Sequence, residues 1–187
     1  MPFGKKFRRD PTAERARRLY EQVILQARQP ALYRTLGVPD SLDGRFEMIT
    51  LHLFMVLHRF KQSGQADADV LGQALCNIMF ADMDVSLREM GAGDLGVGGR
   101  VKRMASGFMG RVVAYSSGLA ATPELLGQAL RRNVYGTTDA DDRIVAAMAR
   151  YVRESVARLA RQSEESITAG RLDFALISDS EGPDTGH

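Results

Sequence analysis

The chain has 187 residues, of which 44% are hydrophobic and 26% are charged, and its formal net charge is only +2. This composition is typical of a globular protein, excludes a mainly disordered chain, and gives no electrostatic reason to expect DNA binding. The single cysteine, Cys76, excludes a disulfide within the chain and favours a reducing compartment.

Apolar residues recur at helical spacing in six segments, and no segment shows the alternation of a half-buried strand. The spacing predicts helices over residues 11–29, 43–62, 67–90, 95–119 and 123–135, and a last helix from Thr138 or Asp139. Residues 31–41 are expected to form a short helical turn or loop, and residues 172–178 a strand-like or packing segment. The prediction is an all-α fold, a single-domain bundle of about six helices.

Composition at the two ends predicts three parts, a basic N-terminal arm over 1–10, a helical domain over 11–176 and a polar tail over 177–187. The segment 43–62 is apolar on most of its sides, which is typical of a helix in the middle of a bundle. Thr122 is a candidate N-cap, with Pro123 at the first helical position after it. No stretch approaches the roughly 20 apolar residues of a membrane span, so we expect a cytoplasmic protein.

Motifs of enzymes are weak or absent. The sequence from Gly91 to Gly96 fits GxGxxG, but a helical pattern precedes it where a dinucleotide site needs a strand, so a nucleotide-dependent enzyme is disfavoured. His52 and His58 are six residues apart and do not form a ligand pair on one helix face. Cys76 lies in an apolar run, where burial makes a thiol inert. We therefore expect no catalytic residue, no cofactor and no metal.

The most unusual stretch is 80–115, which concentrates charge, glycine and methionine. Its acidic residues close one predicted helix and its basic residues begin the next, so the two groups are expected to face each other across a glycine-rich turn. Asp84 and Arg88 are four residues apart and can instead pair on the surface of their own helix. The methionines suit either a core or a flexible apolar binding surface.

This stretch resembles the ubiquinol–cytochrome c chaperone family, the assembly factors for cytochrome b. The residues that carry the resemblance are Phe80, Asp82, Met83, Asp84, Leu87, Arg88, Glu89, Met90, Gly91, Gly93, Asp94, Lys102, Phe108, Gly110, Arg111 and Tyr115, followed by Ala129–Leu130, Arg132–Asn133 and Tyr135–Gly136. Two departures are Val97-Gly98-Gly99, where relatives often have Val-Pro-Lys, and Met109, where they tend to have tyrosine. The resemblance covers about residues 10 to 170.

The resemblance implies a binding protein and not an enzyme. It implies that cytochrome b, or its nascent chain, is bound near the ribosome, together with a small partner protein, at the inner face of a bacterial membrane. The residues expected to contact the partner are Asp82, Asp84, Arg88, Glu89, Asp94, Lys102, Arg103, Phe108, Arg111 and Tyr115.

A second hypothesis rests on the N-terminus. Residues 1–18 hold seven basic and two acidic side chains, and a basic arm of this kind suits ribosomal RNA or an anionic membrane surface. The alternative function is a helical adaptor that binds the ribosome or the membrane through this arm. The arm can equally be a solvated, frayed chain end.

Overall fold

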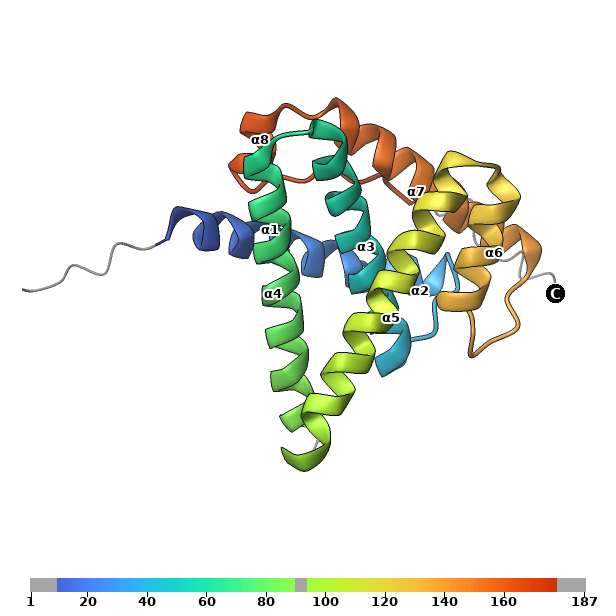
Figure 1. Cartoon of the computed structure of the whole chain (residues 1–187). Helices are drawn as coiled ribbons and strands as arrows, with labels where there is room; N and C mark the ends of the chain where they lie inside the picture. The colour runs from blue at the N-terminus through green and yellow to red at the C-terminus, as the bar shows by residue number, and fades with distance from the viewer. Residues whose placement is uncertain (1–9, 90–93, 178–187) are drawn as a thin grey trace, which may run out of the picture.

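The computed structural model describes residues 10–89 and 94–177, and for Leu87 and residues 94–105 it describes the backbone alone. These ranges hold eight helices and no strand (Figure 1). The helices are α1 (Pro11–Ala27), α2 (Pro30–Arg34), α3 (Leu42–Ser63), α4 (Ala66–Glu89), α5 (Asp94–Ala120), α6 (Pro123–Asn133), α7 (Asp142–Arg161) and α8 (Glu164–Thr168). The all-α prediction is confirmed, and the two helices beyond the expected six, α2 and α8, have five residues each.

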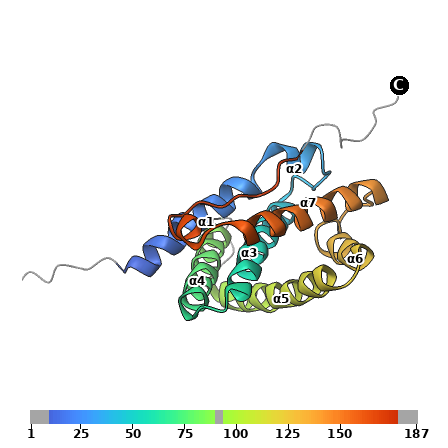
Figure 2. The ribbon, with the colours of Figure 1, turned by 90° about the horizontal axis from the view of Figure 1, so that it is seen from above.

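Helix α3 is the centre of the bundle, as its apolar sequence predicts. It packs against α1, α4, α5 and α7, and Figure 2 shows it among these four helices. Leu51, Leu53, Phe54, Met55 and Val56 point in directions that are spread around α3, and all five are buried, which requires neighbours on most sides of the helix. The C-terminal end of α4 and the N-terminal end of α5 project together from the rest of the bundle (Figure 1).

The start of α3 is fixed by two local features. The side chain of Ser41 accepts a hydrogen bond from the Gly44 amide at 3.1 Å, which caps the helix. A Cβ atom on Gly44 would lie 2.0 Å from the Pro39 carbonyl oxygen, so only glycine allows the preceding loop to pack on this turn. The first turn of α3 is therefore held against the α2–α3 loop.

The last long helix begins later than the sequence predicts, at residue 142. The carboxylate of Asp141 accepts a hydrogen bond from the Arg143 amide at 2.6 Å and so caps α7. The preceding residues form a turn in which the Thr138 amide donates to the Tyr135 carbonyl at 3.0 Å. Thr122 occupies the predicted N-cap position of α6, although its side chain makes no capping hydrogen bond.

A buried polar group in the core is satisfied by neighbouring helices. His52 Nδ1 donates to the Met48 carbonyl at 2.7 Å, and its Nε2 accepts from the Tyr151 hydroxyl at 2.6 Å. The Gln26 amide donates to the same hydroxyl at 3.1 Å, and the Phe174 ring packs edge-on against the imidazole. Burial lowers the pKa of His52 to about 4, so the imidazole is neutral at physiological pH.

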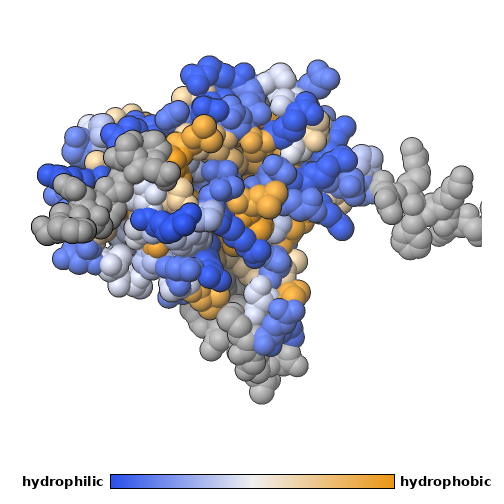
Figure 3. Space-filling model, turned by 180° about the vertical axis from the view of Figure 1, so that it is seen from behind, coloured by the Kyte–Doolittle hydropathy of each residue, from blue (hydrophilic) through white to orange (hydrophobic). Residues whose placement is uncertain are grey.

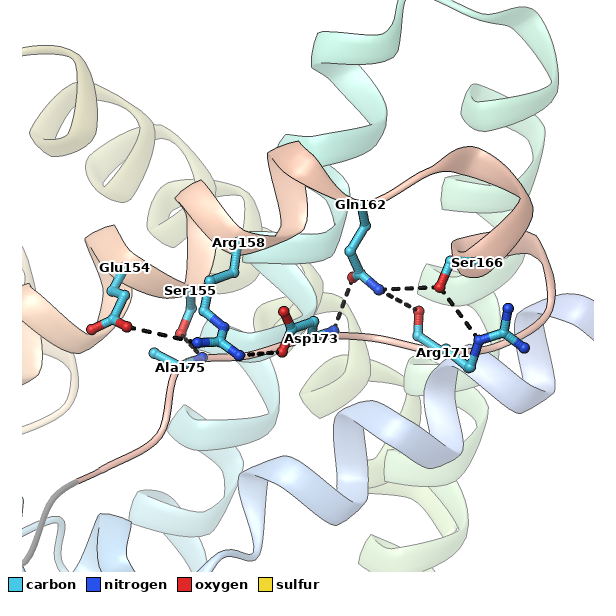
Figure 4. Close-up of polar contacts among 8 residues, drawn as sticks. All are labelled: Glu154, Ser155, Arg158, Gln162, Ser166, Arg171, Asp173 and Ala175. Atoms are coloured by element: carbon cyan, nitrogen blue, oxygen red, sulfur yellow. Dashed lines mark hydrogen bonds and ion pairs between the residues drawn. The ribbon is translucent and has the colours of Figure 1, made fainter.

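Residues 171–177 lie extended along α7 and are fastened to it by polar contacts (Figure 4). The Ala175 amide donates to the Ser155 hydroxyl at 3.1 Å, and the Arg158 guanidinium donates to the Asp173 carboxylate at 2.7 Å. The expected strand-like or packing segment is therefore a packing segment without a strand partner.

The face of the molecule shown in Figure 3 is mostly hydrophilic, with apolar side chains exposed between the hydrophilic ones. The large hydrophobic residues that are exposed in the described part of the chain are Leu25, Leu42, Val70, Val85, Met109, Val113, Leu125 and Leu176. None of the described helices is long and apolar enough to span a membrane.

Candidate partner-binding groove

A groove of about 1350 Å³ lies where the first turns of α3 meet α4, α5, the α1–α2 corner and the end of α6. We call it the Glu47 groove, after the carboxylate in its floor. It is lined by Tyr20, Arg28, Pro30, Tyr33, Arg34, Asp40, Leu42, Asp43, Gly44, Arg45, Phe46, Glu47, Ile49, Asp82, Met83, Ser86, Gly107, Arg111, Arg132, Asn133, Val134, Gly136 and Thr137. A smaller depression of about 780 Å³ between α6 and α7 contains none of the predicted site residues.

The floor of the groove is an ion pair between α3 and α5. The guanidinium of Arg111 donates two hydrogen bonds to the Glu47 carboxylate, one of them from Nε at 2.7 Å, and a third to the Gly107 carbonyl at 3.1 Å. It also lies 5.7 Å from the centre of the Phe46 ring. Burial raises the pKa of Glu47, and the hydrogen bonds and charge of Arg111 oppose that effect.

A second polar contact joins α1 to α4 at the wall of the groove. The hydroxyl of Tyr20 donates to the Asp82 carboxylate at 2.9 Å. Burial and this acceptor raise the pKa of Tyr20 well above its ordinary value, so the phenol stays protonated. Asp82, a predicted site residue, is therefore held in the groove by a tyrosine from a distant part of the sequence.

The other described charges of the 82–89 segment lie outside the groove. Arg88 donates to the Asp84 carboxylate at 2.8 Å, the pair within one helix that the sequence allowed as an alternative. Glu89 is exposed at the end of α4. Surface pairs of this kind contribute little to stability because water and salt screen them.

The two predicted aromatic residues are buried. Phe108 packs edge-on against Phe80 with ring centres 6.0 Å apart, and Tyr115 packs against Phe54 at 5.3 Å. Within the described residues, the Tyr115 hydroxyl is buried without a hydrogen-bond partner. Both rings therefore belong to the hydrophobic core and not to the exposed surface.

The expectation that acids and bases face each other across the glycine-rich turn is not met by the described side chains. Asp82 contacts α1, and Arg111 contacts α3. The side chains of Asp94, Lys102 and Arg103 lie outside the described residues, so their predicted contacts stay predictions. Two of the methionines in this region, at positions 79 and 83, are buried, whereas Met109 is 58% exposed.

Sequence reasoning missed the α3 side of the groove. Glu47 is the only acidic residue between Asp43 and Asp67, in a segment that is otherwise mostly apolar. A lone carboxylate in such a helix indicates a buried, paired charge, because an unpaired one costs too much to bury. Phe46 and Leu42 were also missed, because an apolar residue at a helix start looks like ordinary core.

The described residues hold no group of three histidine, cysteine, aspartate or glutamate side chains that is placed to bind a metal ion. Cys76 is partly buried, and burial raises the pKa of its thiol. The groove combines paired charges in its floor with apolar side chains beside them.

Comparison with known proteins identifies what the chain is similar to. A family model described as ubiquinol-cytochrome C chaperone matches residues 34–174. A crystal structure of the Cbp3 homolog from Brucella abortus is similar with a TM-score of 0.80 and 34% identity, covering 89% of this chain and 92% of that one.

Two animal proteins also match, both named ubiquinol-cytochrome c reductase complex assembly factor 1. The protein of Xenopus laevis is 26% identical over 145 residues, which are 75% of this chain and 70% of the frog protein. The human protein is 24% identical over 164 residues, which are 85% of this chain and 53% of the human one. This chain thus spans only about half of its human relative.

Proposed function

Because the chain belongs to the ubiquinol-cytochrome C chaperone family, we propose that it is a non-enzymatic assembly chaperone that binds cytochrome b, or its nascent chain, during assembly of the ubiquinol–cytochrome c reductase complex. Binding takes place from the cytoplasmic side, at the inner face of a bacterial membrane.

One observation carries the proposal. The family-like residues Asp82, Arg111, Arg132 and Asn133 are spread over three helices, and all four line the Glu47 groove. Beside them, Leu42 is 58% exposed, and the partly buried Phe46 and Ile49 continue its side of α3. An apolar wall next to fixed polar groups is the usual make-up of a specific recognition site.

The groove must be tested at a residue that the fold does not need. Arg111 is unsuitable, because its loss leaves Glu47 buried without a partner. Leu42 is suitable, because its side chain is mostly in solvent, and Leu25 on α1 is a matched control with 60% exposure outside the groove.

The test is a crosslinked pull-down of the full chain from a membrane-containing lysate that makes cytochrome b, with peptide identification. Wild type and Leu25→Gln should enrich cytochrome b equally, and Leu42→Gln should capture several-fold less, because a leucine that becomes buried contributes about 1–2 kcal/mol. Equal capture by both variants would show that the groove is not the contact. Absence of cytochrome b from the wild-type sample would overturn the proposed client.

The basic arm is a second part of the proposal. Arg15, Arg17 and Arg18 on the first turns of α1 are exposed, and they continue the positive charge of the arm toward the bundle. We propose that this end contacts the ribosome or an anionic membrane surface. Deleting residues 1–9 should then weaken ribosome or vesicle binding at low salt, and binding unaffected by the deletion would exclude this role.

A further inference from the structure

The apolar wall of the Glu47 groove has the spacing of a helix-binding stripe. Leu42, Phe46 and Ile49 occupy positions i, i+4 and i+7 of α3, so they lie along one face for about two turns. Grooves that bind an amphipathic helix present such a stripe to the apolar face of their ligand. The stripe alone does not say what the rest of the ligand looks like.

The charges around this stripe constrain the other face of the ligand. Two of the arginines that line the groove are already paired, Arg45 with Asp40 and Arg111 with Glu47. The remaining three, Arg28, Arg34 and Arg132, make no ion pair with any side chain that the structure describes.

Arg28 and Arg34 come from the α1–α2 corner and Arg132 from the end of α6. All three are exposed and have no ion pair or hydrogen bond with any described side chain. The groove also contains two further acidic side chains, Asp43 and Asp82, and Asp82 accepts a hydrogen bond from Tyr20. The uncompensated charge of the groove is therefore positive.

These charges argue against a membrane-spanning segment as the ligand. A segment without polar side chains would cover the three arginines without offering them partners, and the desolvation of each cation would oppose binding. A ligand with acidic side chains beside its apolar face would pair with them instead.

We propose that the Glu47 groove binds an amphipathic helix of its client, with the apolar face on the Leu42–Phe46–Ile49 stripe and acidic side chains against Arg28, Arg34 and Arg132. The inference rests on the proposed function and specifies the class of client segment. In a membrane protein, this segment is an extramembrane helix and not one of the spanning helices.

The test uses fluorescein-labelled 18-residue helical peptides with one Leu face and a polar face of Glu, Gln or Lys. Fluorescence anisotropy with the full chain should give about tenfold tighter binding for the Leu/Glu peptide than for the Leu/Gln peptide, and the weakest binding for Leu/Lys. Raising the salt from 50 to 500 mM should remove most of the difference. Equal affinities for the three peptides would overturn the inference.

Two sets of variants assign the effect to the groove. Replacing Arg28, Arg34 and Arg132 together by Gln should abolish the preference for the Leu/Glu peptide. The matched control replaces Arg17, Arg143 and Arg161 by Gln; these are also exposed, and they lie outside the groove. A control that loses the preference to the same extent would show that only the overall charge matters, and would overturn the inference.

Three further outcomes separate this inference from its alternatives. If vesicles containing phosphatidylglycerol bind the wild type and not the groove variant, while the Leu/Glu peptide binds neither, the groove is a lipid site and the inference is wrong. If the peptide preference is absent but Leu42→Gln still reduces cytochrome b capture, the proposed function stands and the acidic-helix inference falls. If the preference is present and cytochrome b is never captured, the groove has another client.

Discussion

The ion pair in the groove floor gives the most demanding prediction about the fold. Glu47 is 5% exposed, and the Arg111 guanidinium supplies its only strong partner among the described side chains. Arg111→Met keeps most of the aliphatic length and removes the cation, so it leaves a buried carboxylate unpaired. We expect a loss of about 3 kcal/mol at pH 7, toward the low end for a buried pair because the Arg111 side chain is 22% exposed.

The pH dependence identifies the cause. In Arg111→Met, burial acts on Glu47 without the opposing hydrogen bonds, so the folded-state pKa of Glu47 rises further above its unfolded value. A raised folded-state pKa favours folding below the unfolded pKa, and that stability is lost as the pH rises through the folded pKa. The destabilisation of the variant should therefore be largest at pH 7 and smaller at pH 5.

The assay is urea unfolding followed by helical circular dichroism at both pH values. The double variant Glu47→Gln/Arg111→Met removes both charges and should be more stable at pH 7 than Arg111→Met alone. The reasoning is refuted if Arg111→Met lies within 1 kcal/mol of wild type, or if the double variant is no more stable than the single one.

Three further predictions concern the stability of the fold. Burial holds the pKa of His52 at about 4 in the folded state, so the free energy of unfolding should fall by roughly 3 kcal/mol because of this residue as the pH drops from 6.5 to 4. The variant His52→Gln should lose less stability over that pH range, and an equal loss would contradict the assignment. A Cβ on Gly110 would meet nothing within 4 Å, whereas one on Gly118 would lie 2.6 Å from Leu126 Cα. Gly110→Ala should therefore raise the stability by about 0.5–1 kcal/mol, and Gly118→Ala should lower it by about 1–3 kcal/mol. A shift of the thermal unfolding temperature in the same direction for both variants would contradict this contrast. Tyr115→Phe removes a buried hydroxyl without a partner among the described residues, so its urea midpoint should equal or exceed that of wild type, and a loss above 1 kcal/mol would show that the hydroxyl is bonded.

The helices could be predicted because their signals are local. Apolar spacing located the six long helices, and the continuous apolar sequence around Leu51 and Phe54 marked α3 as the central one. Boundaries were predicted less accurately where several residues could cap a helix. Three aspartates, at positions 139, 141 and 142, lie at the start of α7, and the structure shows that Asp141 is the one that caps it. The short helices α2 and α8 have too few residues to show a period.

The site could be predicted only in part because its contacts join distant segments. Asp82 and Arg111 were expected in it from their motif, and both line the groove. Their partners, Tyr20 and Glu47, are 62 and 64 residues away in sequence, and many other side chains could have paired with them. Sequence alone also placed Phe108 at the contact surface, whereas the packing of α5 buries it.

Site-specific photo-crosslinking can test whether the Glu47 groove holds cytochrome b during assembly, as we propose. A photoreactive amino acid would be placed at position 42 in the groove and, in a second sample, at position 25 outside it, in cells that assemble the reductase complex. We expect a cytochrome b adduct from position 42 and none from position 25. Adducts of equal yield from both positions, or an adduct from position 25 alone, would contradict the proposal.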